Sequence, residues 1–164
     1  MSARLQPRFE RRAMSTRDVD SVQAIEASAY SFPWTRGNFI DSLAAGYLAE
    51  VLEADGATAG YFVAMVGVDE LHLLNVTVAP AHQGQGMGSL LLDAVSHHGR
   101  RLGLARLLLE VRHSNQQARA LYQRRGFAVV GLRRSYYPAL LGREDAVVMS
   151  LPLALPAGNL HALV

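Results

Sequence analysis

The sequence Gln83-Gly84-Gln85-Gly86-Met87-Gly88 joins an apolar stretch that ends at Val78 to an amphipathic stretch that begins at Met87. Glycine carries no Cβ, so a glycine-rich backbone can approach a ligand closely. The first turn of a helix adds unpaired N–H groups and the positive end of the helix dipole, which together favour a phosphate group. A strand, a glycine-rich loop and a helix in this order predict an α/β fold with a candidate phosphate site.

Three kinds of phosphate site could use such a loop. A nucleoside triphosphate loop requires a lysine, which the chain lacks. A dinucleotide-binding loop follows an early strand and requires a glycine where this mid-chain loop has Ser89. The third kind binds the pyrophosphate of coenzyme A. A tight strand-to-helix turn without a ligand is the structural alternative, and the glycines alone leave it open.

Helical and strand patterns alternate on both sides of the loop. Helices are expected at about 15–29, 35–45, 87–102 and 115–125, and strands at about 9–14, 47–53, 58–68, 70–78, 106–112, 127–136 and 145–151. Asp55-Gly56 marks a turn between two of these strands. Helices interspersed among strands predict one mixed sheet with helices on both faces, which is an α/β (α+β) architecture.

Composition limits the possible chemistry. The 164 residues fit one domain, expected at 1–151, with 152–164 as a tail. All 16 cationic side chains are arginine, and the chain contains neither lysine nor cysteine. These absences exclude disulfides, thiol nucleophiles, cysteine-ligated metals and Schiff-base chemistry. The 14 acidic residues leave a formal net charge of only +2, so no strongly cationic field is expected.

Signals for targeting and for macromolecular partners are weak. The first dozen residues lack the apolar core of a secretory signal, although their arginine-rich, acid-poor composition faintly resembles a transit peptide. No apolar stretch approaches the length of a membrane span. The six histidines show no metal-like spacing, and the arginine doublets lack the aromatic platform of an RNA-binding sheet. We expect a cytoplasmic protein with no metal, membrane segment or direct nucleic-acid contact, and its oligomeric state stays open.

The pattern Gln83-x-x-Gly86-x-Gly88, placed after the strand residues 75–78, resembles the acetyl-CoA signature of the GCN5-related N-acetyltransferase (GNAT) family. The resemblance covers roughly residues 15–151 and includes Leu-Glu-Val-Arg at 109–112 and Gly-Arg-Glu-Asp-Ala at 142–146. These two motifs and Arg-Arg-Ser-Tyr-Tyr-Pro at 133–138 are similar to one branch, the bacterial RimI-like ribosomal-protein-alanine N-acetyltransferases. The resemblance implies a mixed, mostly antiparallel sheet of about seven strands flanked by about four helices.

The resemblance implies transfer of acetyl from acetyl-CoA to an amine. In that branch the acceptor is the N-terminal alanine of the small-subunit ribosomal protein bS18, so a ribosomal-protein N-terminal peptide is the expected partner. An α-amine has an ordinary pKa of about 8, against about 10.4 for lysine, so one modest base suits it better. Without cysteine for an acyl-enzyme, direct attack in a ternary complex is expected. Another amine acceptor and a non-catalytic acetyl-CoA-binding module stay open as alternatives.

Glu110 is the candidate general base. It lies in an otherwise apolar strand, where a carboxylate is costly unless it is paired or its pKa is raised. We expect a raised pKa, which suits a base that works near neutral pH. An ion pair with Arg112 or another arginine is the alternative, and the strand alone does not decide between them. The resemblance favours the base, acting through water.

The resemblance assigns further roles along the chain. Tyr122 lies on an expected helical stripe, where a core tyrosine is the plain alternative, and the resemblance makes it the acid that protonates the departing CoA sulfur. Backbone N–H groups of 76–78 would polarise the thioester carbonyl. Asn115, an expected helix cap, would also bond the pantetheine arm. The expected cofactor-binding residues are Val76, Thr77, Val78, Gln83, Gly84, Gln85, Gly86, Met87, Gly88, Ser89, Asn115 and Tyr122.

Two aromatic–proline clusters, at 32–34 and 136–138, lie in or beside expected loops. The resemblance places them beside the peptide groove, so the expected substrate-binding residues are Phe32, Trp34, Tyr136 and Tyr137. Packing against the core is the alternative for Trp34 and for one tyrosine. Glu144 and Asp145 could pair with basic residues of a ribosomal-protein tail, or with Arg143.

Overall fold

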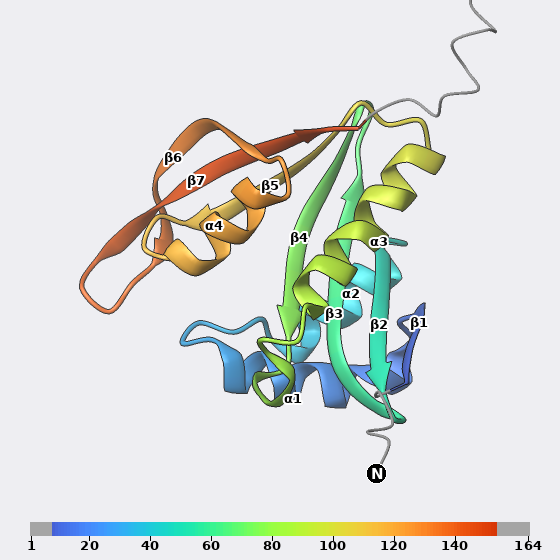
Figure 1. Ribbon diagram of the computed structural model, residues 1–164. Coiled ribbons are helices and arrows are strands. Elements are labelled where there is room, and N and C mark those ends of the chain that lie inside the picture. The colour runs from blue at the N-terminus through green and yellow to red at the C-terminus, as the bar shows by residue number, and fades with distance from the viewer. Residues whose placement is uncertain (1–7, 154–164) are drawn as a thin grey trace, which may run out of the picture. The chain divides into compact units, whose positions relative to one another are not determined.

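The computed structural model describes residues 8–153 and is shown in Figure 1. Its strands are β1 Phe9–Ala13, β2 Leu48–Ala54, β3 Ala57–Val66, β4 Glu70–Val78, β5 Arg106–Arg112, β6 Ala128–Pro138 and β7 Arg143–Pro152. Its α-helices are α1 Val19–Ala29, α2 Arg36–Ala44, α3 Met87–Arg101 and α4 Gln116–Arg124, with 3-10 turns η1 Thr16–Asp18 and η2 Pro80–His82. The seven expected strands and four expected helices are confirmed, with ends that differ by up to a few residues. Of the expected tail, residues 154–164 lie outside the described residues.

The strands form one mixed sheet in the order β1-β2-β3-β4-β5-β7-β6. β1 and β2, β5 and β7, and β6 and β7 pair antiparallel, whereas β4 and β5 pair parallel. A parallel pair requires a crossover connection, and α3 supplies it between β4 and β5. The expected mixed, mostly antiparallel sheet is therefore confirmed.

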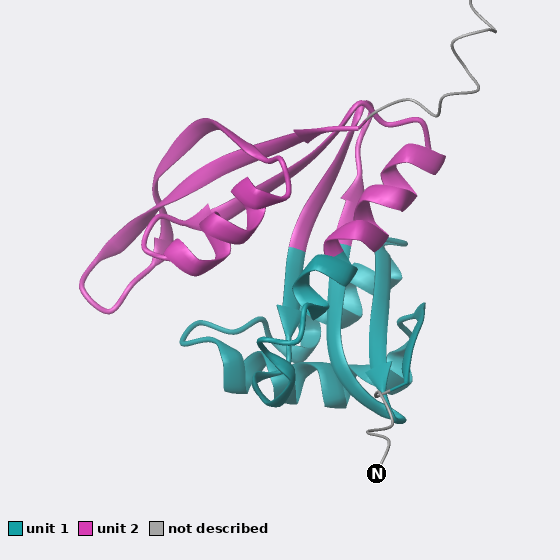
Figure 2. Cartoon of the chain, in the orientation of Figure 1, with its two compact units in different colours: residues 1–63, 75–91 teal, residues 64–74, 92–164 magenta. Residues whose placement is uncertain are grey.

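The chain divides into two compact units, coloured teal and magenta in Figure 2. Within the described residues, unit 1 consists of 8–63 and 75–91, and unit 2 consists of 64–74 and 92–153. β3, β4 and α3 each contribute residues to both units. Among residues 8–153, no helix combines the length and apolar character that a membrane crossing requires.

Unit 1 is organised by the buried side of α1. Ser15 and Asp18 form a capping box where the chain enters the helical segment, so the helix start is set by local hydrogen bonds. Val19, Val22 and Glu26 are spaced three and four residues apart and share one side of α1. All three are buried, so the helix places a carboxylate among apolar side chains.

A second helix and its preceding loop complete the core of unit 1. The Thr35 side chain accepts a hydrogen bond from the Asn38 N–H at 3.1 Å, which confirms the expected cap of α2. The Phe39 ring is fully buried and its centroid lies 5.2 Å from that of Trp34 and 5.8 Å from that of Tyr61. The loop before α2 is therefore anchored to the core through an aromatic contact.

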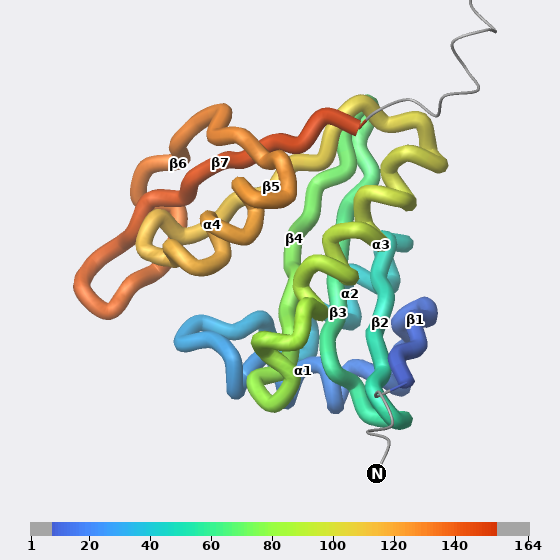
Figure 3. The backbone as a smooth tube through the Cα atoms, viewed as in Figure 1, coloured from blue at the N-terminus to red at the C-terminus, as the bar shows by residue number. Residues whose placement is uncertain are grey.

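In unit 2, β5 shows the period-two pattern of a strand with one buried face. Leu107, Leu109 and Val111 are buried, and they alternate with the half-buried Leu108 and Glu110. β5 pairs with β7, which in turn pairs with β6, and the β6–β7 hairpin is the orange-to-red tube in Figure 3. The alternation fixes which face of β5 carries the carboxylate, because successive side chains point to opposite faces.

Candidate active site

The glycine-rich loop in unit 1 has the backbone geometry that a phosphate site needs. Gly84 and Gly86 adopt φ values of +80° and +81°, in the left-handed region that favours glycine. Among the described residues, the N–H groups of Gly84, Gln85 and Gly86 have no hydrogen-bond partner. α3 begins directly after them at Met87, where the first N–H groups of a helix also lack internal partners. The loop therefore presents a row of unpaired donors that fits an anionic group.

Gln83 and the strand before it lie next to this loop. The Gln83 side-chain amide donates to the Val78 carbonyl at 3.3 Å, which ties the loop to the end of β4. β3 and β4 approach closely here, because a Cβ on Gly60 would lie 2.9 Å from the Thr77 carbonyl oxygen. The expected cofactor residues from Val76 to Ser89 all belong to unit 1.

Glu26 lies at the centre of a buried hydrogen-bond network in unit 1 that the sequence analysis missed. The residue is only 2% exposed. Its Oε1 accepts hydrogen bonds from the Tyr61 hydroxyl at 2.8 Å and from the Asn75 side-chain amide at 2.9 Å, and its Oε2 accepts one from the Trp34 N–H at 2.9 Å. Burial and the charge of Glu26 raise the pKa of Tyr61. The signal in the sequence was a carboxylate on the apolar stripe of α1.

The same network reaches the middle of β4. The Thr77 hydroxyl donates to Oδ1 of Asn75 at 2.8 Å and shares a hydrogen bond of 2.8 Å with the hydroxyl of Tyr30. Burial raises the pKa of Tyr30. One network thus connects Trp34, an expected substrate-binding residue, with Thr77, an expected cofactor-binding residue. Phe32, the other expected residue of this loop, is 41% exposed.

In unit 2, Glu110 contacts a histidine and an arginine. Its Oε2 lies 2.6 Å from Nε2 of His72, and its Oε1 lies 3.3 Å from Nε of Arg133. The parallel register pairs His72 with Leu108, so His72 and Glu110 lie on the same face of the sheet, two residues apart in register. The paired register ends at Leu73 and Leu109, and Glu110 is the next residue along β5.

The expected raised pKa of Glu110 is wrong. Burial alone raises it, but the hydrogen bond from His72 and the charges of His72 and Arg133 outweigh burial and hold the pKa below its ordinary value. The alternative of an ion pair with Arg112 or another arginine is confirmed by Arg133, whose Nε lies 3.3 Å from Glu110. Arg112 donates to the Pro138 carbonyl at 2.7 Å. Glu110 is therefore a paired carboxylate that stays ionised at neutral pH.

Tyr122 and Asn115 lie on α4 and at its start. Tyr122 is 9% exposed, and its ring centroid lies 5.6 Å from that of Phe127. The Asn115 side-chain oxygen accepts a hydrogen bond from the Ala118 N–H at 3.1 Å, which confirms the expected cap. The Asn115 Nδ2 has no partner among the described residues, so it is available as a donor.

The second aromatic cluster lies on β6, close to Glu110. The ring centroids of Tyr136 and Tyr137 are 4.9 Å apart, and the Arg133 guanidinium lies 5.3 Å from the Tyr136 ring. Burial and the charge of Glu110 raise the pKa of Tyr137 to about 12. Unit 2 therefore brings the expected base and both expected tyrosines of the substrate site together through Arg133.

Glu144 and Asp145, the acidic residues of β7, do not pair with Arg143, which was the alternative to pairing with a substrate. Glu144 accepts a hydrogen bond from the Ser114 N–H at 2.8 Å, and its other oxygen lies 3.6 Å from Arg112. These contacts hold the pKa of Glu144 below its ordinary value. Arg143 instead donates to the carbonyls of residues 135 and 136. A pair between Arg143 and either acid is therefore wrong for the described structure.

Comparison with known proteins connects these residues to a family. The sequence pattern of the Acetyltransferase (GNAT) family matches residues 19–127. The [ribosomal protein bS18]-alanine N-acetyltransferase of Escherichia coli (strain K12) is 38% identical over 143 residues, which are 87% of this chain and 97% of that protein. Its Haemophilus influenzae counterpart is 37% identical over 134 residues, 81% of this chain and 91% of that protein. The crystal structure of the ribosomal-protein-S18-alanine N-acetyltransferase from Escherichia coli superposes with a TM-score of 0.85 at 37% identity, covering 93% of this chain and 98% of that chain.

Proposed function

We propose a reaction and a substrate for this chain from one premise: it belongs to the GNAT family of acetyltransferases. It is an acetyl-CoA-dependent acetyltransferase, and the proposed acceptor is the α-amine of an N-terminal alanine on ribosomal protein bS18. The observation that carries the proposal is the similarity to the E. coli bS18 enzyme over 97% of that protein's length. We also propose that residues 1–151 act as one acetyltransferase domain.

Acetyl-CoA is proposed to be held by backbone donors more than by charged side chains. The unpaired N–H groups from Gly84 to Ser89 would bind its pyrophosphate, because they face an anion without first having to break internal hydrogen bonds. Gln83 supports this loop through its bond to β4. The free amide nitrogen of Asn115 would donate to the pantetheine arm. These roles need no lysine, which the chain lacks.

The proposed chemical step is a direct displacement at the thioester. The acceptor ammonium loses a proton to the site that contains Glu110, and the neutral nitrogen then attacks the carbonyl carbon. Backbone N–H groups of Val76–Val78 would stabilise the developing oxyanion. The C–N bond forms, the C–S bond breaks, and the Tyr122 hydroxyl gives its proton to the departing sulfur. The attacking nitrogen loses its second proton to solvent as the amide forms, and Tyr122 takes a proton back from solvent.

The acceptor peptide is proposed to contact the two aromatic clusters. Phe32 and Trp34 present an aromatic surface on the loop that the Glu26 network anchors in unit 1. Tyr136 and Tyr137 present another in unit 2, next to the ionised Glu110. A basic residue that follows the N-terminal alanine of the acceptor peptide would form an ion pair with the carboxylate of Glu144.

The test is acetylation by the purified chain with acetyl-CoA and three acceptors. These are a peptide that begins Ala-Arg, an N-terminally blocked peptide with one lysine, and a small primary amine. Mass spectrometry and CoA release are measured for each. We expect acetylation of the Ala-Arg peptide at its α-amine. Preference for lysine or the small amine would reassign the acceptor, and acetyl-CoA binding without CoA release would indicate a non-catalytic module.

A further inference from the structure

We propose that His72 takes the proton from the acceptor amine, and that Glu110 orients its ring and balances its charge. This inference rests on the proposed function and refines the role of Glu110 within it. The observation behind it is the 2.6 Å contact between Nε2 of His72 and Oε2 of Glu110.

Access to solvent favours His72 over Glu110 as the group that meets the amine. The side chain of His72 is 24% exposed, whereas that of Glu110 is 9% exposed. Both carboxylate oxygens of Glu110 are already engaged, one by His72 and the other by Arg133 at 3.3 Å. An incoming amine would have to displace one of these partners to reach Glu110, but it can approach the histidine without displacing either.

The geometry leaves one ring nitrogen of His72 for the substrate. With a proton on Nε2, the neutral ring donates its hydrogen bond to Glu110 and keeps the lone pair on Nδ1. No other partner of the His72 ring occurs among residues 8–153. Glu110 thus selects the tautomer whose basic nitrogen points away from the carboxylate, as the acidic member does in a catalytic triad.

Ordinary pKa values also favour an imidazole over a carboxylate as the group that accepts the proton. An α-ammonium has an ordinary pKa of about 8, and an imidazole of about 6.5 is better matched to it than a carboxylate of about 4.3. The contacts of Glu110 lower its pKa further, so the carboxylate is a still weaker proton acceptor and stays negatively charged beside the histidine. Proton transfer is most efficient between two groups whose pKa values are close to each other.

The proposed step moves a proton from the acceptor ammonium to His72. One N–H bond of the ammonium breaks and an N–H bond forms at Nδ1 of His72, which becomes an imidazolium beside the Glu110 carboxylate. The freed nitrogen lone pair attacks the thioester carbon. As the C–S bond breaks, the Tyr122 hydroxyl protonates the sulfur, the new amide nitrogen loses its second proton to solvent, and Tyr122 takes a proton back from solvent. His72 returns its own proton to solvent after the product leaves. The charged and titratable groups next to the pair of His72 and Glu110 are Arg133 and Tyr137, both on β6. The charge of Glu110 raises the pKa of Tyr137.

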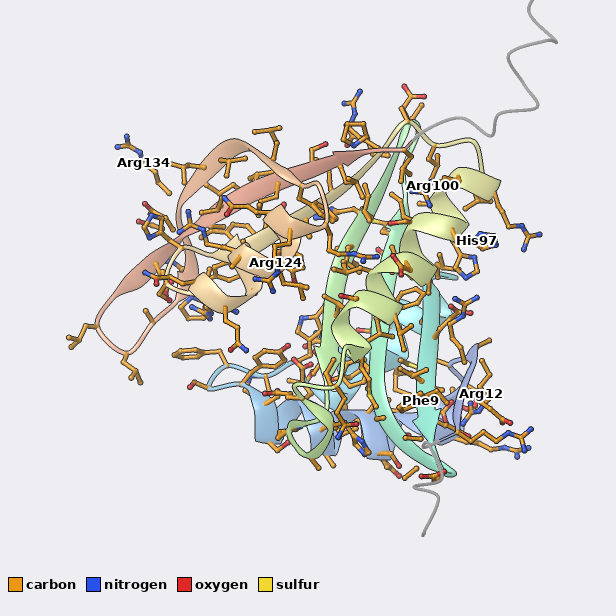
Figure 4. All side chains as sticks on the ribbon, in the orientation of Figure 1. Phe9, Arg12, His97, Arg100, Arg124 and Arg134 are labelled. Carbon is orange, nitrogen blue, oxygen red and sulfur yellow. The ribbon has the colours of Figure 1, made fainter. Side chains whose placement is uncertain are left out.

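The experiment compares His72→Gln with His97→Gln, a matched control on the exposed part of α3 that is labelled in Figure 4. The turnover number kcat is measured with saturating acetyl-CoA and Ala-Arg peptide from about pH 6 to about pH 9. We expect His72→Gln to lower kcat by about 10²-fold below pH 7. The loss should shrink above about pH 8, because the bound amine then loses its proton to solvent without help. His97→Gln should stay within about twofold of wild type throughout.

A loss that is equal at every pH would identify a structural role and overturn the proposal, as would no loss at all. The acetyl-CoA dissociation constant and the thermal midpoint are measured alongside, and His72→Asn replaces His72→Gln if that variant does not fold. If the wild type acetylates another amine instead of the peptide, the proposed substrate fails, and the pH series with that amine still tests His72.

Discussion

Two carboxylates with little solvent exposure, one in each unit, are stabilised by different kinds of partner. Glu26 in unit 1 is 2% exposed and accepts hydrogen bonds from a hydroxyl, a side-chain amide and a backbone N–H. Glu110 in unit 2 has a side chain that is 9% exposed and contacts a histidine and an arginine. Neutral hydrogen-bond donors surround Glu26, whereas Glu110 contacts a charged arginine and a histidine.

The difference distinguishes a carboxylate with a structural role from the one for which we propose a role in catalysis. The donors around Glu26 do not titrate near neutral pH, so the network holds the loop of Trp34 and the strand of Thr77 in one arrangement. Glu110 contacts His72, whose side chain is 24% exposed, and this is the route that we propose for the proton. A buried carboxylate is therefore a candidate for catalysis when its partners can exchange protons, and burial by itself does not make it one.

The largest expected effect is that of Glu110→Gln on turnover. Loss of the charge should lower kcat by about 10²-fold or more, most strongly at low pH, because the amine then has no anion to support its deprotonation. Acetyl-CoA affinity, measured by calorimetry, should change by less than about twofold. Glu70→Gln, on the neighbouring strand with a side chain 39% exposed, is the matched control and should keep wild-type turnover. Wild-type rates for Glu110→Gln from about pH 6 to about pH 9 would remove the distinction between the two acids.

Glu26→Gln should act on stability instead. An amide cannot accept at both positions, so either the Trp34 N–H or the Tyr61 and Asn75 donors would meet an NH₂ group. We expect the free energy of unfolding, measured in urea, to fall by about 2 kcal/mol. Glu10→Gln, whose side chain is 59% exposed, should change it by less than about 0.5 kcal/mol. A pH profile of kcat altered in shape by Glu26→Gln would show that this acid also takes part in proton transfer.

Tyr122→Phe tests whether a residue of unit 2 also donates the proton to the departing CoA sulfur. A thiolate leaving group has a low pKa and needs less help than an amine, so we expect kcat to fall by only about tenfold. The Michaelis constant for acetyl-CoA should stay near the wild-type value, because the ring and its contact with Phe127 remain. An unchanged kcat, together with a rate that pre-steady-state kinetics assign to chemistry, would make Tyr122 a core residue only.

The smallest expected effect is the pH dependence of stability from Glu110. Its folded pKa lies below the unfolded value, so its stabilising contribution is present above the unfolded pKa of about 4.3 and is lost as the pH falls through the folded value. The gap in unfolding free energy between wild type and Glu110→Gln should therefore narrow between about pH 6 and about pH 3. A gap that widens on acidification would mean that burial, and not His72 and Arg133, dominates at this carboxylate.

Much of the fold could be predicted from local patterns. The residues of β5 were identified completely because Leu107–Leu109 and Val111 form a short apolar run of strand length. The caps at Thr35 and Asn115 were predictable because each side chain bonds a backbone N–H only three residues away. The turn at Asp55-Gly56 shows the positive φ values, +51° and +84°, that this dipeptide favours. Each of these features depends on neighbours along the chain.

The electrostatics of the site could not be predicted in the same way. His72 lies 38 residues before Glu110 in the sequence and reaches it only because β4 and β5 pair in parallel at one register. Arg133 reaches the same carboxylate from β6. The raised pKa that the apolar strand indicated was wrong because the strand pattern shows how deeply Glu110 is buried but not which charges lie beside it.

The sequence by itself determined the strand and helix pattern, the position of the glycine loop, the absence of lysine and cysteine chemistry, and the resemblance to an acetyltransferase family. The tertiary structure alone decided that Glu26 is held by neutral donors and that Glu110 is paired with His72 and Arg133. The physical reason is range. Backbone conformation follows from residues a few positions apart, whereas the charge state of a buried carboxylate follows from groups that only strand pairing and helix packing bring within hydrogen-bond distance.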